Sequence, residues 1–293
     1  MSDFLILNRL SWYWRLPAKW AAFAIVAGLV CFPYPTLLAR HVQHWRNPDA
    51  LIEPNAPALA PLASELRARV PAGLPPKDAL RHVQTFVLEK VPYDWDWNTW
   101  GLADYLPTVA EVLEQGREDC DGRAVIAASL LETLGYEAKL VTDFSHVWVR
   151  TQHGDLMGPG KRTAVTATDK GLNVTLRGLA ELPRALAYGM AVFPAQREMI
   201  ILVAAWLLML GPRARFGRAA LSLSAMTAGL FLLRSGGSAY LKPVIWMQVL
   251  GFACVVAAVL CLLVPAGVAR RPTMLEEPGD SYRAATVRER LAP

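Results

Sequence analysis

The stretch that decides the fold of this 293-residue chain is Glu118-Asp119-Cys120-Asp121-Gly122-Arg123-Ala124, followed later by Ser145-His146-Val147-Trp148-Val149. The first stretch opens an apolar helical pattern, and the second opens an apolar strand. A cysteine is therefore expected at a helix start and a histidine at a strand start. A thiol nucleophile needs a base that reaches it from another element, and this layout supplies one.

Cys120 is expected to be the reactive thiol of this layout. A helix N-terminus lowers a thiol pKa, because its unpaired N–H groups favour negative charge. Asp119 and Asp121 oppose this effect unless they cap N–H groups or pair with arginines. The alternative is a structural cysteine and a strand histidine that never meet. The other cysteines lie in strongly apolar segments, so no internal disulfide framework is expected: Cys31, Cys254 and Cys261.

The two ends of the chain have the composition of membrane spans. Hydrophobic residues make up 54% of the sequence, and they cluster outside its middle. Spans are predicted at 20–38, 194–211, 219–235 and 244–268. The first should kink near Pro33 and Pro35. The second has a short apolar stretch, Met199 to Leu210. The alternative is a buried helical hairpin of a soluble protein.

Two further patterns bear on these spans. Ala220, Ser224 and Ala228 form a small-residue stripe that predicts close helix packing in the third span. Basic residues flank the spans on one side, which predicts a cytoplasmic N-terminus (1–19), a flexible cytoplasmic tail (269–293) and a central region outside. For a bacterial chain this means the inner membrane, with the central domain in the periplasm. The flanking residues are Arg9, Arg15, Lys19, Arg213, Arg215, Arg218, Arg270 and Arg271.

The central region predicts an α+β domain over 76–193, after a Pro/Ala-rich linker at 39–75 with one short helix, Ala60 to Val70. Helices are expected on one side of an antiparallel sheet. A helix is expected from Lys77 to Lys90, and Thr108 with Glu111 forms a capping-box pattern. The buried helix from Asp119 to Leu134 should end at Gly135. Strands are expected at 137–142, 146–151, 155–157 and 163–168.

Several spaced motifs follow one another through the central region: Val91-Pro92-Tyr93-Asp94, Leu106-Pro107-Thr108, Glu111-Val112-Leu113, Asp119-Cys120-Asp121-Gly122-Arg123-Ala124, Leu134-Gly135-Tyr136 and His146-Val147-Trp148-Val149. Together these motifs resemble the bacterial transglutaminase-like superfamily. The resemblance covers about Lys77 to Pro159 and implies a papain-like core with a Cys-His-Asp triad, as in many bacterial proteases and amidases. It implies that Cys120 is the nucleophile and His146 the base.

The chain departs from this family at the third triad position. The family places an aspartate in the strand after the histidine, and here that position is Gly158. Asp155 lies close to the turn and is a weaker candidate, while Asp169 would need a different strand pairing. Losing the orienting carboxylate can cost several orders of magnitude in rate. Some thiol enzymes nevertheless work as Cys-His dyads.

Aromatic residues before Cys120 have two interpretations. Trp100 and Tyr105, with Trp95 and Trp97, would line a cleft and supply an oxyanion donor, or they would pack the domain against its helices or the membrane. His82 and His153 are expected to be solvated. No Cys/His cluster has zinc spacing, so neither a metal nor another cofactor is expected.

The function predicted from these features is a membrane-anchored thiol hydrolase or acyltransferase. It would act on an amide of an extracytoplasmic protein or peptide. The alternative is a catalytically silent domain that serves as a binding or assembly subunit of a membrane complex, with other subunits or copies as partners. A transporter is disfavoured, because the spans carry almost no ionisable residues. A net charge of +5 without an aromatic-interleaved basic run excludes nucleic-acid binding.

Overall fold

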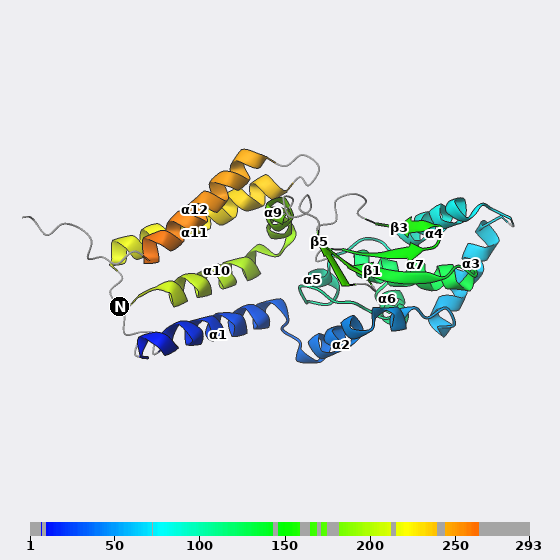
Figure 1. Cartoon of the computed structure of the whole chain (residues 1–293), viewed down its shortest axis with the longest axis horizontal. Helices are drawn as coiled ribbons and strands as arrows, with labels where there is room; N and C mark the ends of the chain where they lie inside the picture. The colour runs from blue at the N-terminus through cyan, green and yellow to red at the C-terminus, as the bar shows by residue number, and fades with distance from the viewer. Residues whose placement is uncertain are drawn as a thin grey trace, which may run out of the picture.

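The computed structural model describes residues 7, 10–71, 73–142, 146–158, 165–168, 171–174, 182–211, 215–238 and 244–263. The chain is mostly helical. Long helices lie side by side at one end of the molecule, and a mixed domain with a small sheet lies at the other (Figure 1).

The helical end consists of α1 (Trp12–Cys31), α9 (Leu182–Val192), α10 (Ala195–Met209), α11 (Phe216–Gly237) and α12 (Ile245–Leu263). Three of these are long and apolar enough to cross a membrane: α1, α11 and α12. A fourth span exists only if α9 and α10 act together, and they meet at a bend of 117°. The prediction of a membrane protein is thus supported.

The predicted first and second spans differ from the observed helices. The helix expected at 20–38 begins earlier and ends at Cys31, and the chain resumes as α2 (Pro35–Arg46) after a break at Pro33. Proline lacks the N–H that a continuous helix requires, which explains the break. The second span is short because Pro194 separates α10 from α9.

Among the predicted flanking residues, Arg9, Arg213, Arg270 and Arg271 lie outside the described residues, while Lys19 and Arg218 bond to helix ends away from the mixed domain. Lys19 Nζ donates to the carbonyl oxygen of Leu210 over 3.1 Å, and Arg218 donates to that of Cys261. At the opposite end, Ala103 N–H donates to Cys31 O over 2.8 Å. This arrangement is what the predicted topology requires. The side on which the domain lies remains a prediction.

The predicted small-residue stripe does not make the contact between α11 and α12. Ala220, Ser224 and Ala228 are exposed, and that contact runs through Gly229 instead. A Cβ at Gly229 would lie 2.8 Å from the carbonyl oxygen of Gly251, so the two backbones are in close contact. The buried face of α11 consists mostly of other small residues, and it is made of Ala219, Ser222, Met226, Gly229, Leu233, Gly236 and Gly237. Close helix packing through the stripe itself remains a prediction.

The mixed domain begins well before Pro76, because the segment expected to be a linker folds into it. This segment contains η3 (Pro48–Leu51), η4 (Pro57–Leu59) and α3 (Ala60–Arg69). Leu51, Leu59 and Leu66 are buried in the same core as the later helices. Proline at the first positions of η3, η4 and α3 starts these helices rather than preventing structure.

The remaining helices of the domain are α4 (Pro76–Lys90), α5 (Asp96–Thr99), α6 (Val109–Gln115) and α7 (Cys120–Thr133). The predicted helices at 77–90 and 119–134 are confirmed. The Thr108–Glu111 capping box is present, and Gly135 follows α7 with a φ of 86°. α7 is buried over most of its length, as its apolar composition predicted.

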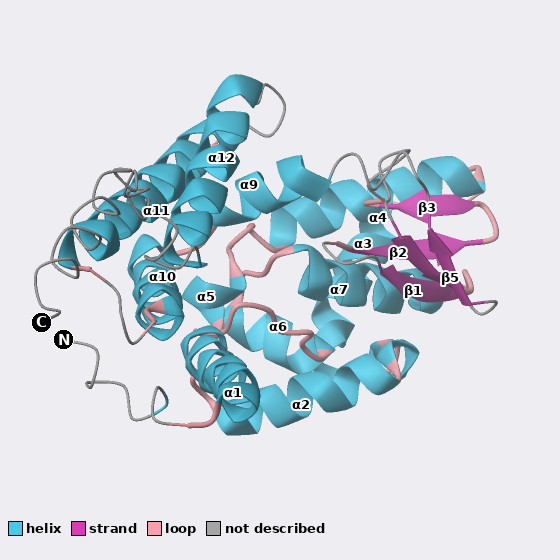
Figure 2. Cartoon of the chain, turned by 60° about the vertical axis from the view of Figure 1, so that its left-hand side comes forward, coloured by secondary structure: helices cyan, strands magenta, loops and turns pink. Residues whose placement is uncertain are grey.

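A three-stranded antiparallel sheet lies against α7, with the order β1 (Ala138–Thr142), β2 (Val147–Thr151), β3 (Gly154–Leu156). Leu140 pairs with Val149, and Val149 pairs with Leu156. β4 (Val165–Thr168) and β5 (Gly171–Val174) form a separate hairpin. Helices cover one face of the sheet (Figure 2). The predicted antiparallel sheet is confirmed, whereas a papain-like core remains a prediction.

Candidate active site

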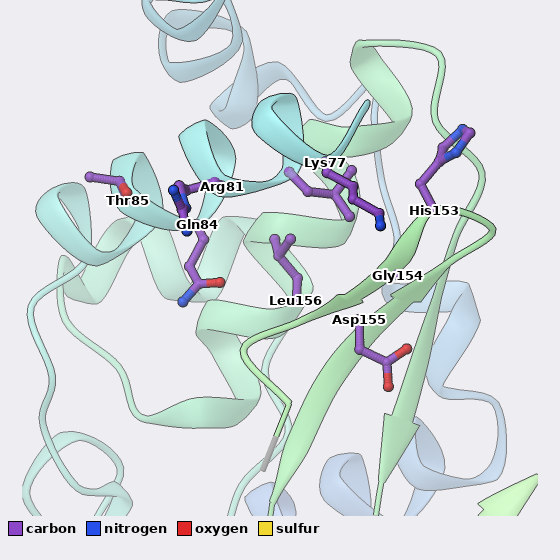
Figure 3. Close-up of a pocket in the computed structure, with 9 residues that line it drawn as sticks. Lys77, Arg81, Gln84, Thr85, His153, Gly154, Asp155 and Leu156 are labelled. Carbon is purple, nitrogen blue, oxygen red and sulfur yellow. The ribbon is translucent and has the colours of Figure 1, made fainter. Parts of the chain in front are cut away.

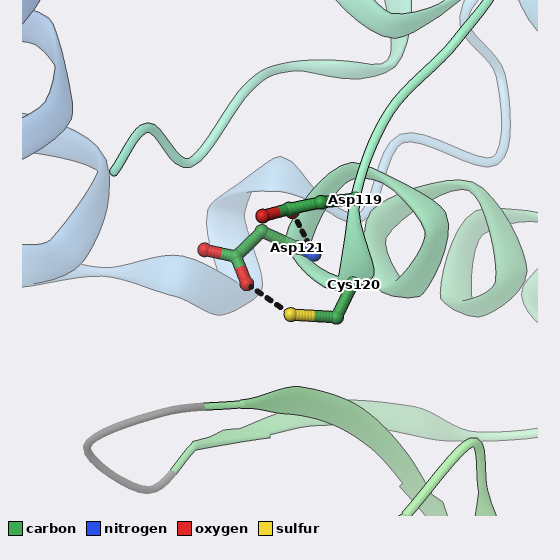
Figure 4. Close-up of side chains that lie close together, drawn as sticks. All are labelled: Asp119, Cys120 and Asp121. Atoms are coloured by element: carbon green, nitrogen blue, oxygen red, sulfur yellow. Dashed lines mark hydrogen bonds between the residues drawn. The ribbon is translucent and has the colours of Figure 1, made fainter. Parts of the chain in front are cut away.

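Cys120 is the first residue of α7, with Asp119 at the N-cap. The Asp119 carboxylate accepts the backbone N–H of Asp121 over 3.0 Å and so satisfies one of the unpaired donors of the helix start. The Cys120 sulfur lies on the side of the helix that faces the strands (Figure 4). Its S–H donates to Asp121 Oδ1 over 3.1 Å.

The surroundings of Cys120 favour the protonated thiol. Burial raises the pKa of Cys120 well above its usual value, and the charges of Asp121 and Asp119 raise it further. The backbone N–H of Val147 faces the sulfur and opposes this rise in pKa. Val147 is the first residue of β2 and directly follows His146 in the sequence.

His146 is oriented by a backbone carbonyl. Its Nε2 lies 2.7 Å from Met157 O. A carbonyl oxygen can only accept, so Nε2 carries the proton and Nδ1 is the basic nitrogen. The ring also stacks on Trp148, with ring centroids 6.2 Å apart. The histidine therefore has the tautomer and the support that a general base requires.

Met157 holds this carbonyl in an unusual backbone conformation. Its φ is 56°, and it is the one non-glycine residue with positive φ in the described part of the chain. Such a conformation costs about 1–3 kcal/mol and persists only where surrounding contacts impose it. Strained backbone of this kind is concentrated at functional sites.

The structure places the predicted nucleophile at the first position of α7 and the predicted base directly before β2, and it does not join them. Within the described residues, the Cys120 sulfur has no hydrogen bond to His146, and its proton goes to Asp121 instead. Arg117 and Arg123 do not neutralise the acids beside the thiol through ion pairs: Arg117 pairs with Asp94, and Arg123 donates to Val91 O.

No carboxylate in the described part of the chain takes the third triad position. A Cβ added at Gly158 would lie 3.3 Å from Trp148 Cδ1, so this position borders the ring that stacks on His146. Asp155 accepts from Trp148 Nε1 over 3.0 Å and from Arg150 Nε over 3.0 Å. Asp169 lies outside the described residues. The Met157 carbonyl therefore orients the ring, a role that no residue type in the sequence could signal.

Trp100 and Tyr105 use their polar groups away from Cys120. Trp100 Nε1 donates to Glu118 Oε2 over 2.8 Å, and the Tyr105 hydroxyl donates to Glu111 Oε1 over 2.9 Å. Their ring centroids are 4.8 Å apart. Both residues therefore pack the domain in this conformation. Among the described residues, the backbone N–H of Cys120 has no acceptor, so it is a donor that an oxyanion could use.

A cluster of buried carboxyl groups next to Cys120 was missed by sequence reasoning. Asp96 and Glu118 are at most 1% exposed, and they lie beside Asp119 and Asp121. Burial, followed by the charges of Asp119, Asp121 and Glu118, raises the pKa of Asp96 to about 12. Burial raises the pKa of Asp119 to about 7 and that of Asp121 well above its usual value.

The same carboxyl groups are the residues that could hold a cation. The donor atoms of Asp96, Glu118 and Asp119 lie within 4.8 Å of one another, as do those of Asp119, Cys120 and Asp121. Carboxylate oxygens suit Ca²⁺ and Mg²⁺. No metal site was predicted from the sequence, because no Cys/His cluster has zinc-ligand spacing. That criterion does not consider carboxylates that come together from separate segments of the chain.

An aromatic segment connects this site to the helical end of the molecule. Trp95 stacks on Trp97 with centroids 4.8 Å apart, and these rings contact Tyr188 and Phe193 at the bend between α9 and α10. Arg234 of α11 donates to the carbonyl oxygens of Met190 and Phe193, which fixes that bend. The aromatic residues are therefore packed against the helical end, as the packing interpretation predicted.

Comparison of the chain with protein-family models, with curated proteins and with solved structures gives no match.

Proposed function

We propose that the protein is a membrane-anchored thiol hydrolase or acyltransferase that cleaves an amide of a protein or peptide. The observation that carries the proposal is a cysteine at the first position of α7 together with His146, directly before β2, whose Nε2 is held by Met157 O. A Cys-His dyad of this kind can function without a third carboxylate, because a thiol needs less help from a base than a hydroxyl does. The transglutaminase-like resemblance of the motifs supports the same chemistry.

In the proposed reaction, the Cys120 sulfur attacks the amide carbonyl carbon while its proton passes to His146 Nδ1. The backbone N–H of Cys120 stabilises the oxyanion. The C–N bond then breaks as His146 protonates the leaving amine. Water or an amine attacks the resulting thioester with His146 again as base, which releases the acyl product and restores the thiol.

The buried acids decide how readily the thiolate forms. A charged Asp121 would oppose it, yet burial holds the pKa of Asp121 well above its usual value and that of Asp119 at about 7. A protonated carboxyl group carries no charge, so both acids oppose the thiolate least when they retain their protons. The proposed reaction therefore depends on the protonation of this cluster.

A thiol-directed electrophile tests the proposal. The full-length protein in detergent is treated with chloroacetamide at pH 7, and alkylation of each cysteine is followed by peptide mass spectrometry. We expect Cys120 to react faster than free cysteine, and a Cys120→Ser variant to lose only that product. A Cys120 rate no higher than that of free cysteine would reject the proposal.

The second candidate is a catalytically silent assembly subunit. The hydrogen bond from Cys120 to Asp121 favours it, because this bond directs the proton away from His146. Under this alternative, the Cys120→Ser protein would be isolated with the same associated proteins as the wild type and would support the same cellular function. Loss of function with unchanged association would instead favour the enzyme.

A further inference from the structure

A groove lies between α4 and the hairpin that carries β3. It has a volume of about 640 Å³, is largely open to solvent, and is lined by Lys77, Arg81, Gln84 and Thr85 on one side and by residues 153–156 on the other. This volume is in the range of small-ligand sites. Figure 3 shows the helix side chains on one side of the groove and the hairpin on the other. The groove is separate from Cys120 and has no part in the proposed reaction.

The helix side of the groove carries positive charge without a partner. Lys77 and Arg81 are four residues apart and so share one face of α4. Both are exposed, and among the described residues neither forms an ion pair or hydrogen bond. Every acid of the lining is already engaged: Asp155 is held by Arg150 through two hydrogen bonds and points away from α4 (Figure 3). The groove therefore complements an anionic ligand.

The strand side of the groove offers a free backbone edge. β3 is an outer strand of its sheet and pairs with β2 alone among the described strands. An outer edge presents N–H and C=O groups to which an extended chain can add as a further strand. A groove between such an edge and a helix fits an extended peptide better than it fits a compact ion.

We propose that this groove binds an extended acidic polypeptide segment, which adds to the edge of β3 and places its carboxylates against Lys77 and Arg81. β3 continues into Met157, the residue whose carbonyl orients His146. A segment bound along β3 is therefore directed toward the candidate active site. Binding stands apart from the thiol chemistry; only its interpretation as substrate selection rests on the proposed function.

The test measures binding by the full-length Cys120→Ser protein in detergent, where no turnover occurs. The probe is a fluorescein-labelled octapeptide of alternating Val and Glu, and the readout is fluorescence anisotropy. The comparison peptides are alternating Val and Lys, and Val and Glu with N-methylated backbone amides. We expect the acidic peptide to bind and the basic one not to bind. N-methylation should weaken binding by about tenfold or more, since strand addition needs the peptide N–H groups.

Variants assign the binding to the groove. Lys77→Glu/Arg81→Glu should weaken binding of the acidic peptide by at least about tenfold, a change of about 1.4 kcal/mol. Arg46→Glu, at an exposed cation on α2 that lines no groove, should leave it unchanged. Equal weakening by both variants, or none by the groove variant, would overturn the proposal. Full competition by millimolar phosphate, with no effect of N-methylation, would also overturn it in favour of a small-anion site.

The outcome is separable from that of the alkylation test. Slow alkylation of Cys120 with intact peptide binding would reject the proposed enzyme and support the peptide-binding groove. Fast alkylation of Cys120 without peptide binding would support the enzyme and reject the groove.

Discussion

The thiol half of the candidate site is surrounded by groups that titrate, whereas the histidine half is held by a backbone carbonyl that does not. Cys120 lies among Asp119, Asp121 and the neutral Asp96, all largely buried. His146 depends on Met157 O and on the ring of Trp148. The comparison teaches that the orientation of the base is fixed by the fold, while the charge state of the nucleophile is set by pH. The predictions below test that division.

The largest expected effect is on the pH dependence of stability. Raising the pKa of Asp119 from 3.8 to about 7 means that the folded protein keeps a proton that the unfolded chain loses. The proton that Asp119 retains therefore stabilises the folded state. This contribution to the free energy of unfolding, on the order of 4 kcal/mol, is fully present below pH 4 and is lost as the pH rises to about 7. Thermal melting in detergent should therefore show a higher Tm at pH 5 than at pH 8.

Asp119→Asn is the matched control, because asparagine caps a helix as well as aspartate does but does not titrate. The variant should reduce the difference in Tm between pH 5 and pH 8. An unchanged difference would show that the titration belongs to other groups.

A smaller effect is expected from filling the space beside the thiol helix. A Cβ at Gly122 would lie 2.1 Å from Glu118 Cγ and 2.7 Å from Val112 Cγ2. Gly122→Ala should therefore destabilise the protein by about 1–3 kcal/mol, seen as a lower Tm. Gly189→Ala, at a helical glycine with open space around it, should not lower the Tm. An unchanged Tm in the Gly122→Ala variant would contradict the close packing described around the start of α7.

A change in reactivity of about tenfold is expected when the acid bonded to the thiol loses its charge. Asp121→Asn removes a carboxyl group that raises the pKa of Cys120 through its charge, once it loses its proton, and through the hydrogen bond from the thiol, so the thiolate fraction at pH 8 should increase. Chloroacetamide alkylation of Cys120 at pH 8 should be about tenfold faster, which corresponds to one pKa unit. A slower reaction would mean that Asp121 assists the thiol rather than opposing it.

The smallest effect is expected from a substitution at Met157, beside the histidine. Met157→Gly relieves the positive φ of 56° but removes a side chain that packs against the core. The Tm should change little, because the two contributions oppose each other and each is about 1 kcal/mol. The pH dependence of Cys120 alkylation should keep its shape, since the carbonyl that orients His146 remains. A shifted profile would show that the Met157 side chain, and not its carbonyl, supports the ring.

Much of the fold follows from local patterns in the sequence. The period of apolar residues predicted α4 and α7, and strand patterns with a turn at 152–155 predicted the β2–β3 hairpin. Within 39–75 the short helix α3 was predicted, but the packing of this segment was not, because proline-rich composition resembles a linker and burial of Leu51 and Leu59 depends on distant helices. The stripe of α11 does not meet α12, because small residues alone do not indicate which face meets a neighbour.

Only part of the candidate site could be predicted from the sequence. The Cys120 thiol and the His146 ring are recognised by residue type, and their places at a helix start and directly before a strand follow from the apolar patterns. The Met157 carbonyl is a backbone atom, so no residue type identified it. The carboxyl cluster joins Asp96 to Glu118 and Asp119 across 22 positions of chain, and only the folded structure shows that they meet.

The most direct test of the central claim, that His146 is the base of Cys120, is the alkylation rate of Cys120 between pH 5 and pH 9 in wild type and His146→Gln. The wild type should react faster than the variant by about a hundredfold near pH 7, because a positioned general base contributes at least that much. The rates of Cys31, Cys254 and Cys261 in the same digest serve as internal controls and should not change. Equal Cys120 rates in the two proteins across this range would contradict the account.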